Sequence, residues 1–98
     1  MVYLVSYDLV QPERNYEKLH NMLSACSNGK FVKPLESVYL ISSTLSANKI
    51  SELIKSVVDT DDKFILFEVN QNYQGYLSSE LWLDIQNLFL QIQQLMNF

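Results

Sequence analysis

Three stretches of the chain carry the apolar pattern of β-strands. They cover residues 2–9, 36–42 and 63–69, and each is rich in β-branched and aromatic side chains. A shorter extended piece, residues 30–33, runs into Pro34, which has no backbone N–H to donate. We therefore predict that this piece lies at the edge of a sheet.

Two helices are predicted between these strands. The first begins at Pro12 and ends at Asn28 and Gly29, which both tolerate the left-handed backbone of a helix C-terminus. The second is capped by Ser46 and carries an apolar face at helical spacing. The residues of that face are Ile50, Leu53, Ile54 and Val57.

The predicted order is strand, helix, strand, strand, helix, strand, which is the order of a ferredoxin-like α+β sandwich. We predict a single domain over residues 1–98, in which residues 1–70 form this βαββαβ core. Residues 71–98 are a C-terminal extension. Right-handed crossover connections place both core helices on one face of the sheet.

The opposite face of the predicted sheet is also apolar. In the first strand, Val2 and Leu4 point to one side while Tyr3, Val5 and Tyr7 point to the other. An antiparallel sheet with one solvent-exposed face should instead alternate between apolar and polar residues. We therefore expect either a second subunit or the chain's own C-terminus to cover the face that the helices leave free.

The apolar pattern of the C-terminal extension predicts a long amphipathic helix over residues 79 to about 97. Its apolar positions recur every three or four residues, at Leu81, Ile85, Leu88, Ile92 and Leu95. Either Ser78 or Ser79 is placed to cap it. Such a broad apolar face should pack on this subunit's sheet, on a second copy, or on another protein.

Charge and composition narrow the functional classes. Seven Lys and Arg against eleven Asp and Glu give a net charge of −4, so any nucleic-acid binding needs a local basic patch. The single cysteine, Cys26, excludes an intramolecular disulfide and suits a reducing compartment. Neither a signal peptide nor a long apolar run is found. We expect a soluble cytoplasmic protein without membrane association.

Common nucleotide-binding, zinc and metalloprotease motifs are absent from the sequence. We interpret His20, the single histidine, as a half-exposed structural residue of the first helix. Asp59, Asp61 and Asp62 are interpreted as an acidic turn, because the later Gly and Glu of a calcium-binding EF-hand loop are missing.

Asp8 is the remaining candidate for chemistry, because it stands where the first apolar strand ends. One interpretation is structural: the carboxylate caps the helix that begins at Pro12, or closes the turn before it. The other is functional, and the pattern by itself does not choose between them.

Three stretches carry a family resemblance: VYLVSYDL at residues 2–9, LESVYLI at 35–41 and DDKFILFEV at 61–69. At these separations they resemble the small CRISPR-associated Cas-two proteins, and in particular their stand-alone SinR-like and VapD-like relatives. The similarity covers about residues 1–70. The Tyr-Asp pair that ends the first strand is its most specific part.

The resemblance implies a symmetric homodimer that acts as a metal-dependent endonuclease on RNA or DNA. In such a dimer Asp8 of each subunit lies near the two-fold axis, and the pair binds one Mg²⁺ or Mn²⁺. Ser37 matches a small polar residue at the start of the family's third strand and would contact phosphate or metal-bound water. Arg14, Lys30 and Lys33 would form the nucleic-acid-binding patch.

An alternative function from another class stays open. The chain would then be a non-catalytic dimeric interaction module or nucleic-acid-associated adaptor, whose C-terminal helix binds a protein partner and whose Asp8 is structural. That helix also replaces the short C-terminal strand of the family members that take part in CRISPR adaptation. We therefore expect a stand-alone role.

Overall fold

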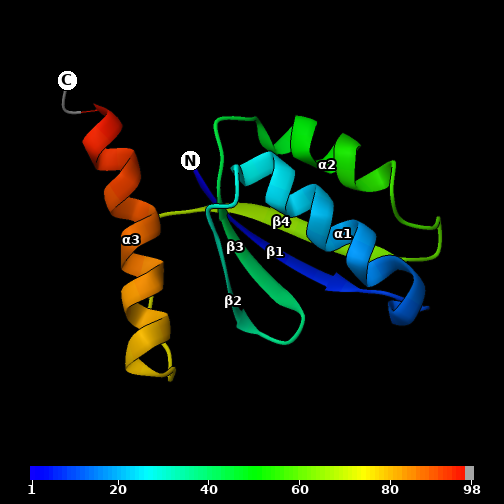
Figure 1. The fold of residues 1–98 in the computed structure, drawn as a ribbon, viewed down its shortest axis with the longest axis horizontal. Helices are drawn as coiled ribbons and strands as arrows, with labels where there is room; N and C mark the ends of the chain where they lie inside the picture. Colours follow the sequence, from blue (N-terminus) through cyan, green and yellow to red (C-terminus); the bar gives the residue numbers. More distant parts are fainter. Residues whose placement is uncertain (97–98) are drawn as a thin grey trace.

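The computed structural model describes the backbone of residues 1–96 and the side chains of residues 1–90. Its elements are β1 (Val2–Asp8), α1 (Pro12–Ser27), β2 (Phe31–Leu35), β3 (Val38–Ser42), α2 (Ala47–Lys55), β4 (Lys63–Val69) and α3 (Ser79–Met96). The strands form an antiparallel sheet in the order β2-β3-β1-β4 (Figure 1). The predicted α+β class is confirmed, and this order is consistent with a ferredoxin-like fold.

The helix ends follow the local chemistry that the sequence predicts. Pro12 opens α1, and Asn28 closes it with a left-handed backbone at φ 52°. The Ser46 side chain accepts a hydrogen bond from the Lys49 backbone at the start of α2 (3.1 Å). The Ser78 hydroxyl accepts a similar bond from the first turn of α3 (3.2 Å).

Several predicted boundaries differ from the structure, among them the end of β1, which stops at Asp8 rather than at residue 9. β3 begins at Val38 rather than at residue 36, because Leu35 already pairs with Val38 and leaves Glu36 and Ser37 as the turn. β2 extends through Pro34 to Leu35, and its pairing shifts register there, since proline has no N–H for the ladder. α2 ends at Lys55 instead of including Val57. The predicted end of the last helix at residue 97 lies outside the described residues.

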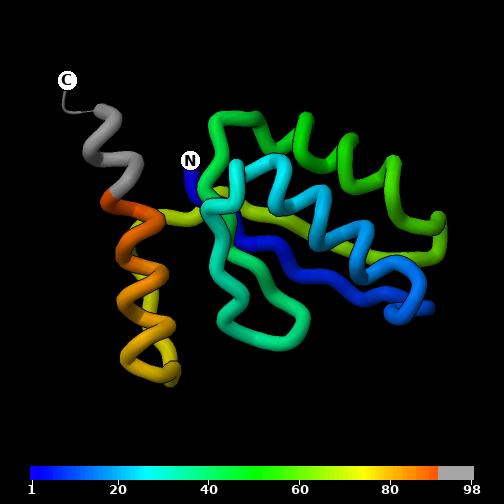
Figure 2. Tube along the Cα trace, in the orientation of Figure 1, coloured from blue at the N-terminus to red at the C-terminus, as the bar shows by residue number. Residues whose placement is uncertain are grey.

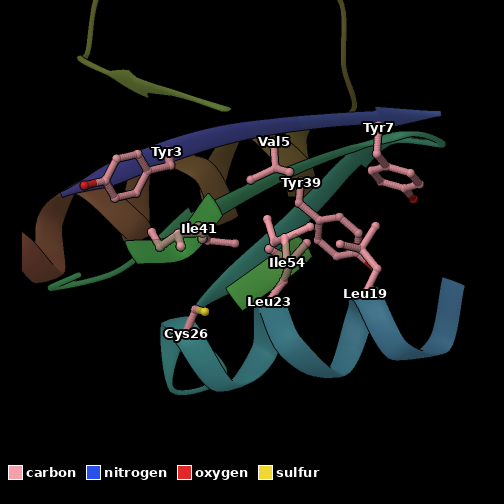
Figure 3. Packing of buried hydrophobic residues seen from close by; sticks show 10 residues of the cluster. Tyr3, Val5, Tyr7, Leu19, Leu23, Cys26, Tyr39, Ile41 and Ile54 are labelled. Carbon is pink, nitrogen blue, oxygen red and sulfur yellow. The ribbon is translucent and has the colours of Figure 1, made fainter. Parts of the chain in front are cut away.

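The first apolar core lies between one face of the sheet and the helices α1 and α2. Figure 3 shows side chains of β1 and β3 pointing toward Leu19 and Leu23 of α1 and Ile54 of α2. Tyr3, Val5 and Tyr7 all point to this side of β1, as the alternation predicts. Their burial fixes which way every other residue of β1 faces.

The second core lies on the opposite face, under α3, which stands apart from α1 and α2 (Figures 1 and 2). Here Val2, Val32 and Leu40 of the sheet pack against Ile85 and Leu88 of the helix. The chain's own C-terminal helix therefore covers part of the face that the other helices leave free. Among residues 1–96, no helix is long and apolar enough to cross a membrane.

The cover provided by α3 is incomplete. It packs over β2 and β3, whereas Ile65 and Phe67 on the outer side of β4 keep exposed fractions of 53% and 56%. Leu35, at the end of β2, is also largely exposed. We call Ile65 and Phe67 the bare patch, because Leu35 lies on β2 at the opposite edge of the sheet. They are apolar surface that this chain leaves in contact with solvent in the described structure.

We predict that α3 contributes to folding through its buried face. Replacing Leu88, which is 4% exposed, with alanine should lower the free energy of unfolding by about 2–5 kcal/mol, because it leaves a cavity against the sheet. Leu90→Ala is the matched control, since Leu90 is 47% exposed on the same helix and should cost about 0.5 kcal/mol or less. Urea denaturation measures both; equal losses would contradict the packing described.

Candidate functional site

Asp8 ends β1 as an exposed carboxylate. Its backbone pairs in register with Lys63 of β4, and the regular alternation of β1 places it on the face that α3 partly covers. Within the described side chains it has neither a hydrogen bond nor an ion pair. The N-cap of α1 is Gln11, and no side chain caps that helix. The structure therefore does not give Asp8 the capping role.

Ser37 lies at the same end of the sheet as Asp8. The Tyr7 backbone N–H donates to the Ser37 carbonyl (3.1 Å), so the β2–β3 turn meets the last residues of β1. Ser37 is exposed and belongs to that turn rather than to the start of a strand. Asp8, Ser37 and Lys63 thus share one polar edge, which adjoins the bare patch along β4.

The basic residues predicted to bind nucleic acid do not form a compact patch. Arg14 lies in the first turn of α1, while Lys30 follows its last residue, so about 20 Å of helix separates them. Lys33 lies on β2, at the edge of the sheet. A nucleic acid touching all three would have to follow the length of α1.

Lys33 takes part in a chain of polar side chains that the sequence did not reveal. Its ammonium donates to the Tyr16 hydroxyl (2.9 Å), which lies 2.9 Å from the Tyr39 hydroxyl; that hydroxyl in turn meets Nδ1 of His20 (2.7 Å). The hydrogen bond from Lys33 lowers the pKa of Tyr16, and burial raises the pKa of Tyr39. This chain ties α1 to β2 and β3, so His20 has the structural role predicted for it.

The acidic turn after α2 is tied to the loop that follows Asp8. The Asp62 carboxylate accepts hydrogen bonds from the backbone N–H of Val10 and from the side chain of Asn15, both at 2.8 Å. Asn15 also donates to Asp59 (2.9 Å) and is only 1% exposed. The turn is therefore structural, as expected, and it fixes the segment that leads out of β1.

Sequence reasoning missed Asn15, Tyr16 and Tyr39 as participants in these two networks. Tyr16 and His20 are four residues apart on one helix, so their contact could have been inferred. The contacts of Asn15 with Asp59 and of Lys33 with Tyr16 join different elements, so the spacing of residues along the chain does not predict them.

No protein-family model, curated protein or solved structure matches this chain. The likeness to the Cas-two proteins therefore rests on the three stretches quoted above, and the function has to be argued from the geometry.

We predict that Asp62 makes folding stability depend on pH. Hydrogen bonds, above all the one from the Val10 backbone N–H, lower the pKa of this carboxyl below its ordinary 3.8. A lowered folded-state pKa means that the contribution is complete above pH 3.8 and is lost as pH falls through the folded value. Asp62→Asn should therefore lower Tm at neutral pH, with the difference from wild type shrinking in acid.

Asp61→Asn is the control for this measurement, because Asp61 is an exposed neighbour without a hydrogen bond in the described structure. Thermal unfolding followed by circular dichroism from pH 7 to pH 2.5 compares the three proteins. A pH-independent difference between wild type and Asp62→Asn would refute the assignment.

Proposed function

We propose that this chain is a Cas-two-like homodimeric endonuclease that hydrolyses RNA or DNA with a divalent metal ion bound by Asp8 of both copies. The observation that carries the proposal is the placement of Asp8. Its carboxylate is exposed, has no partner among the described side chains, and lies on the face of the sheet that carries the bare patch.

The bare patch supports self-association. Ile65 and Phe67 are large apolar side chains, and a second surface that removes them from water would stabilise the associated state. A two-fold dimer brings the same surface of both copies together, so a residue near the axis occurs twice at one place. A second Asp8 would then lie close to the first.

The donor set fits a hard divalent cation only in such a dimer. Among the described residues of one chain, no group of three or more His, Cys, Asp or Glu side chains could hold a metal ion. Two Asp8 carboxylates, with the Ser37 hydroxyl nearby, supply the oxygen ligands that Mg²⁺ or Mn²⁺ prefers. Such an ion, when bound, polarises a phosphodiester and lowers the pKa of an attacking water.

The residues of the chain have separate roles in this proposal. Asp8 provides carboxylate oxygens as ligands for the cation. Ser37, on the adjoining turn, donates its hydroxyl to a phosphate oxygen. Lys63, opposite Asp8 on β4, adds a positive charge at the same edge, where the net charge of −4 would otherwise repel the substrate.

We predict that Asp8→Ala lowers the rate of Mg²⁺- or Mn²⁺-dependent cleavage of single-stranded RNA or DNA by about 100-fold or more, because it removes both metal ligands at once. Asp8 is exposed and without a partner, so the free energy of unfolding should change by about 0.5 kcal/mol or less. Cleavage of a labelled oligonucleotide and urea denaturation measure the two effects.

Asp61→Ala controls for the loss of one surface carboxylate on this acidic protein. It should leave cleavage unchanged. Cleavage that survives Asp8→Ala, or a wild-type protein that cleaves nothing with either metal, would rule out the proposed site.

We also predict that the bare patch is the dimer interface. Phe67→Lys should convert the dimer to a monomer, because it places a charge in the apolar contact. Leu83→Lys is the matched control, since Leu83 is a similarly exposed apolar residue that lies on α3. Light scattering after size exclusion gives the mass of each protein. A wild type that is monomeric at micromolar concentration would refute the interface.

One observation favours the second candidate, a non-catalytic module that binds a protein through its C-terminal helix. Leu83 and Leu90 are exposed and seven residues apart, so they share one side of α3 away from the sheet. An apolar row of this kind suits contact with a partner helix. A dimeric wild type without cleavage activity would make this candidate the better one.

A further inference from the structure

A cavity of about 520 Å³ opens between the sheet, α3 and the segment of residues 70–78, a size typical of small-molecule sites. Figure 2 shows that this segment runs alongside α3 after it leaves β4. Leu4 and Leu40 form the floor, and Trp82 and Phe89 come from the helix. The cavity exists only because α3 covers the sheet incompletely.

Flat aromatic rings form much of the wall. Tyr73 stacks on Trp82 with ring centroids 5.7 Å apart and planes at 11°, and it lies 5.8 Å from Phe89. Tyr76, also at the cavity, is fully exposed and has no ring partner among the described residues. Such surfaces favour a planar ligand that stacks on them.

The polar groups at the cavity are amides. Asn70, Asn72 and Gln74 line it, and within the described residues none of their NH₂ groups donates a hydrogen bond. The side-chain oxygen Oδ1 of Asn70 accepts a hydrogen bond from the Asn72 backbone N–H (2.9 Å), which orients that amide. Amide side chains pair with the donor and acceptor edges of heterocyclic bases.

The charge of the cavity excludes an anionic group from its interior. Among the described lining residues Glu68 carries the one formal charge, with no Lys, Arg or His beside it. A phosphate or carboxylate inside would be repelled and desolvated without a partner. The suitable occupant is planar, uncharged and bordered by hydrogen-bonding atoms.

We propose that the cavity binds a nucleobase, either of a free nucleoside or of a single-stranded nucleic acid. Leu4 in its floor and Asp8 share one face of β1 and stand four residues apart, about 13 Å along the strand. One short single strand therefore spans both places. The role in substrate recognition rests on the proposed nuclease function, whereas binding of the base does not.

Trp82 makes the test direct, because it is the single tryptophan of the chain and lies in the cavity wall. The probes are adenosine, ribose 5-phosphate and an adenine hexaribonucleotide, titrated into Asp8→Ala protein so that no cleavage intervenes. Adenosine should change the Trp82 fluorescence saturably, and ribose 5-phosphate should not. Between about 50 and about 200 mM salt, adenosine affinity should change less than about twofold, since none of the described lining residues is cationic.

Leu4→Phe fills the floor of the cavity and should weaken adenosine binding by roughly tenfold or more. Val10→Phe is the matched control, because it adds the same kind of bulk at an exposed position outside the cavity lining and should leave the affinity unchanged. Circular dichroism confirms that both variants are folded.

The outcomes separate the inference from the function. The inference would be overturned if adenosine gave no saturable response, or if ribose 5-phosphate gave an equal one. It would also be overturned if the signal depended only on protein concentration, because a second copy would then fill the cavity. An adenosine response without one to the hexamer assigns the site to free nucleosides. If the wild type binds adenosine but cleaves no nucleic acid, the proposed nuclease function is refuted and the proposed base-binding site is retained.

Discussion

The structure depends on the burial of β1 from both sides. This strand pairs with β3 along one edge and β4 along the other, and its side chains are apolar on both faces. Val5 and Val2 point in opposite directions, yet both are almost completely buried. Two separate layers must therefore cover the sheet, because the apolar area on either face would otherwise face water at considerable cost in free energy. α1 and α2 form one layer, and α3 forms part of the other.

The partial nature of the second layer accounts for each feature on which the proposals rest. Because α3 packs mainly over β2 and β3, Ile65 and Phe67 on the outer side of β4 stay exposed, and a cavity opens beside the aromatic residues of the helix. Asp8 lies beyond the covered region, at the end of β1, where a second copy would approach. Behind it, the hydrogen bonds of Asn15 and Asp62 hold the outgoing loop to the turn before β4. The proposed chemistry thus occupies the border between rigid core and open surface.

How far the site could be predicted differs from residue to residue. Asp8 was singled out because a carboxylate ending an apolar strand is conspicuous, whereas Ser37 was suggested by the resemblance to the Cas-two proteins. Their common edge follows from antiparallel pairing, which brings the turn before β3 to the end of β1. The basic patch was different: Arg14 and Lys30 are set apart by the length of α1, and the ammonium of Lys33 is engaged by Tyr16. Charges scattered along a sequence carry no information about such distances.

The sequence by itself determined the elements, their order and the two-sided apolar character of β1, because periodicity, caps and turns act between residues close in the chain. The sequence also indicated that either a second subunit or the chain's own C-terminus covers the second face of the sheet. Only the tertiary structure decided that α3 provides this cover within the chain, mainly over β2 and β3 and the first residues of β1. That choice depends on how bulky side chains such as Trp82 and Phe89 fit the twisted sheet, and shape complementarity between distant segments is not written in any local pattern.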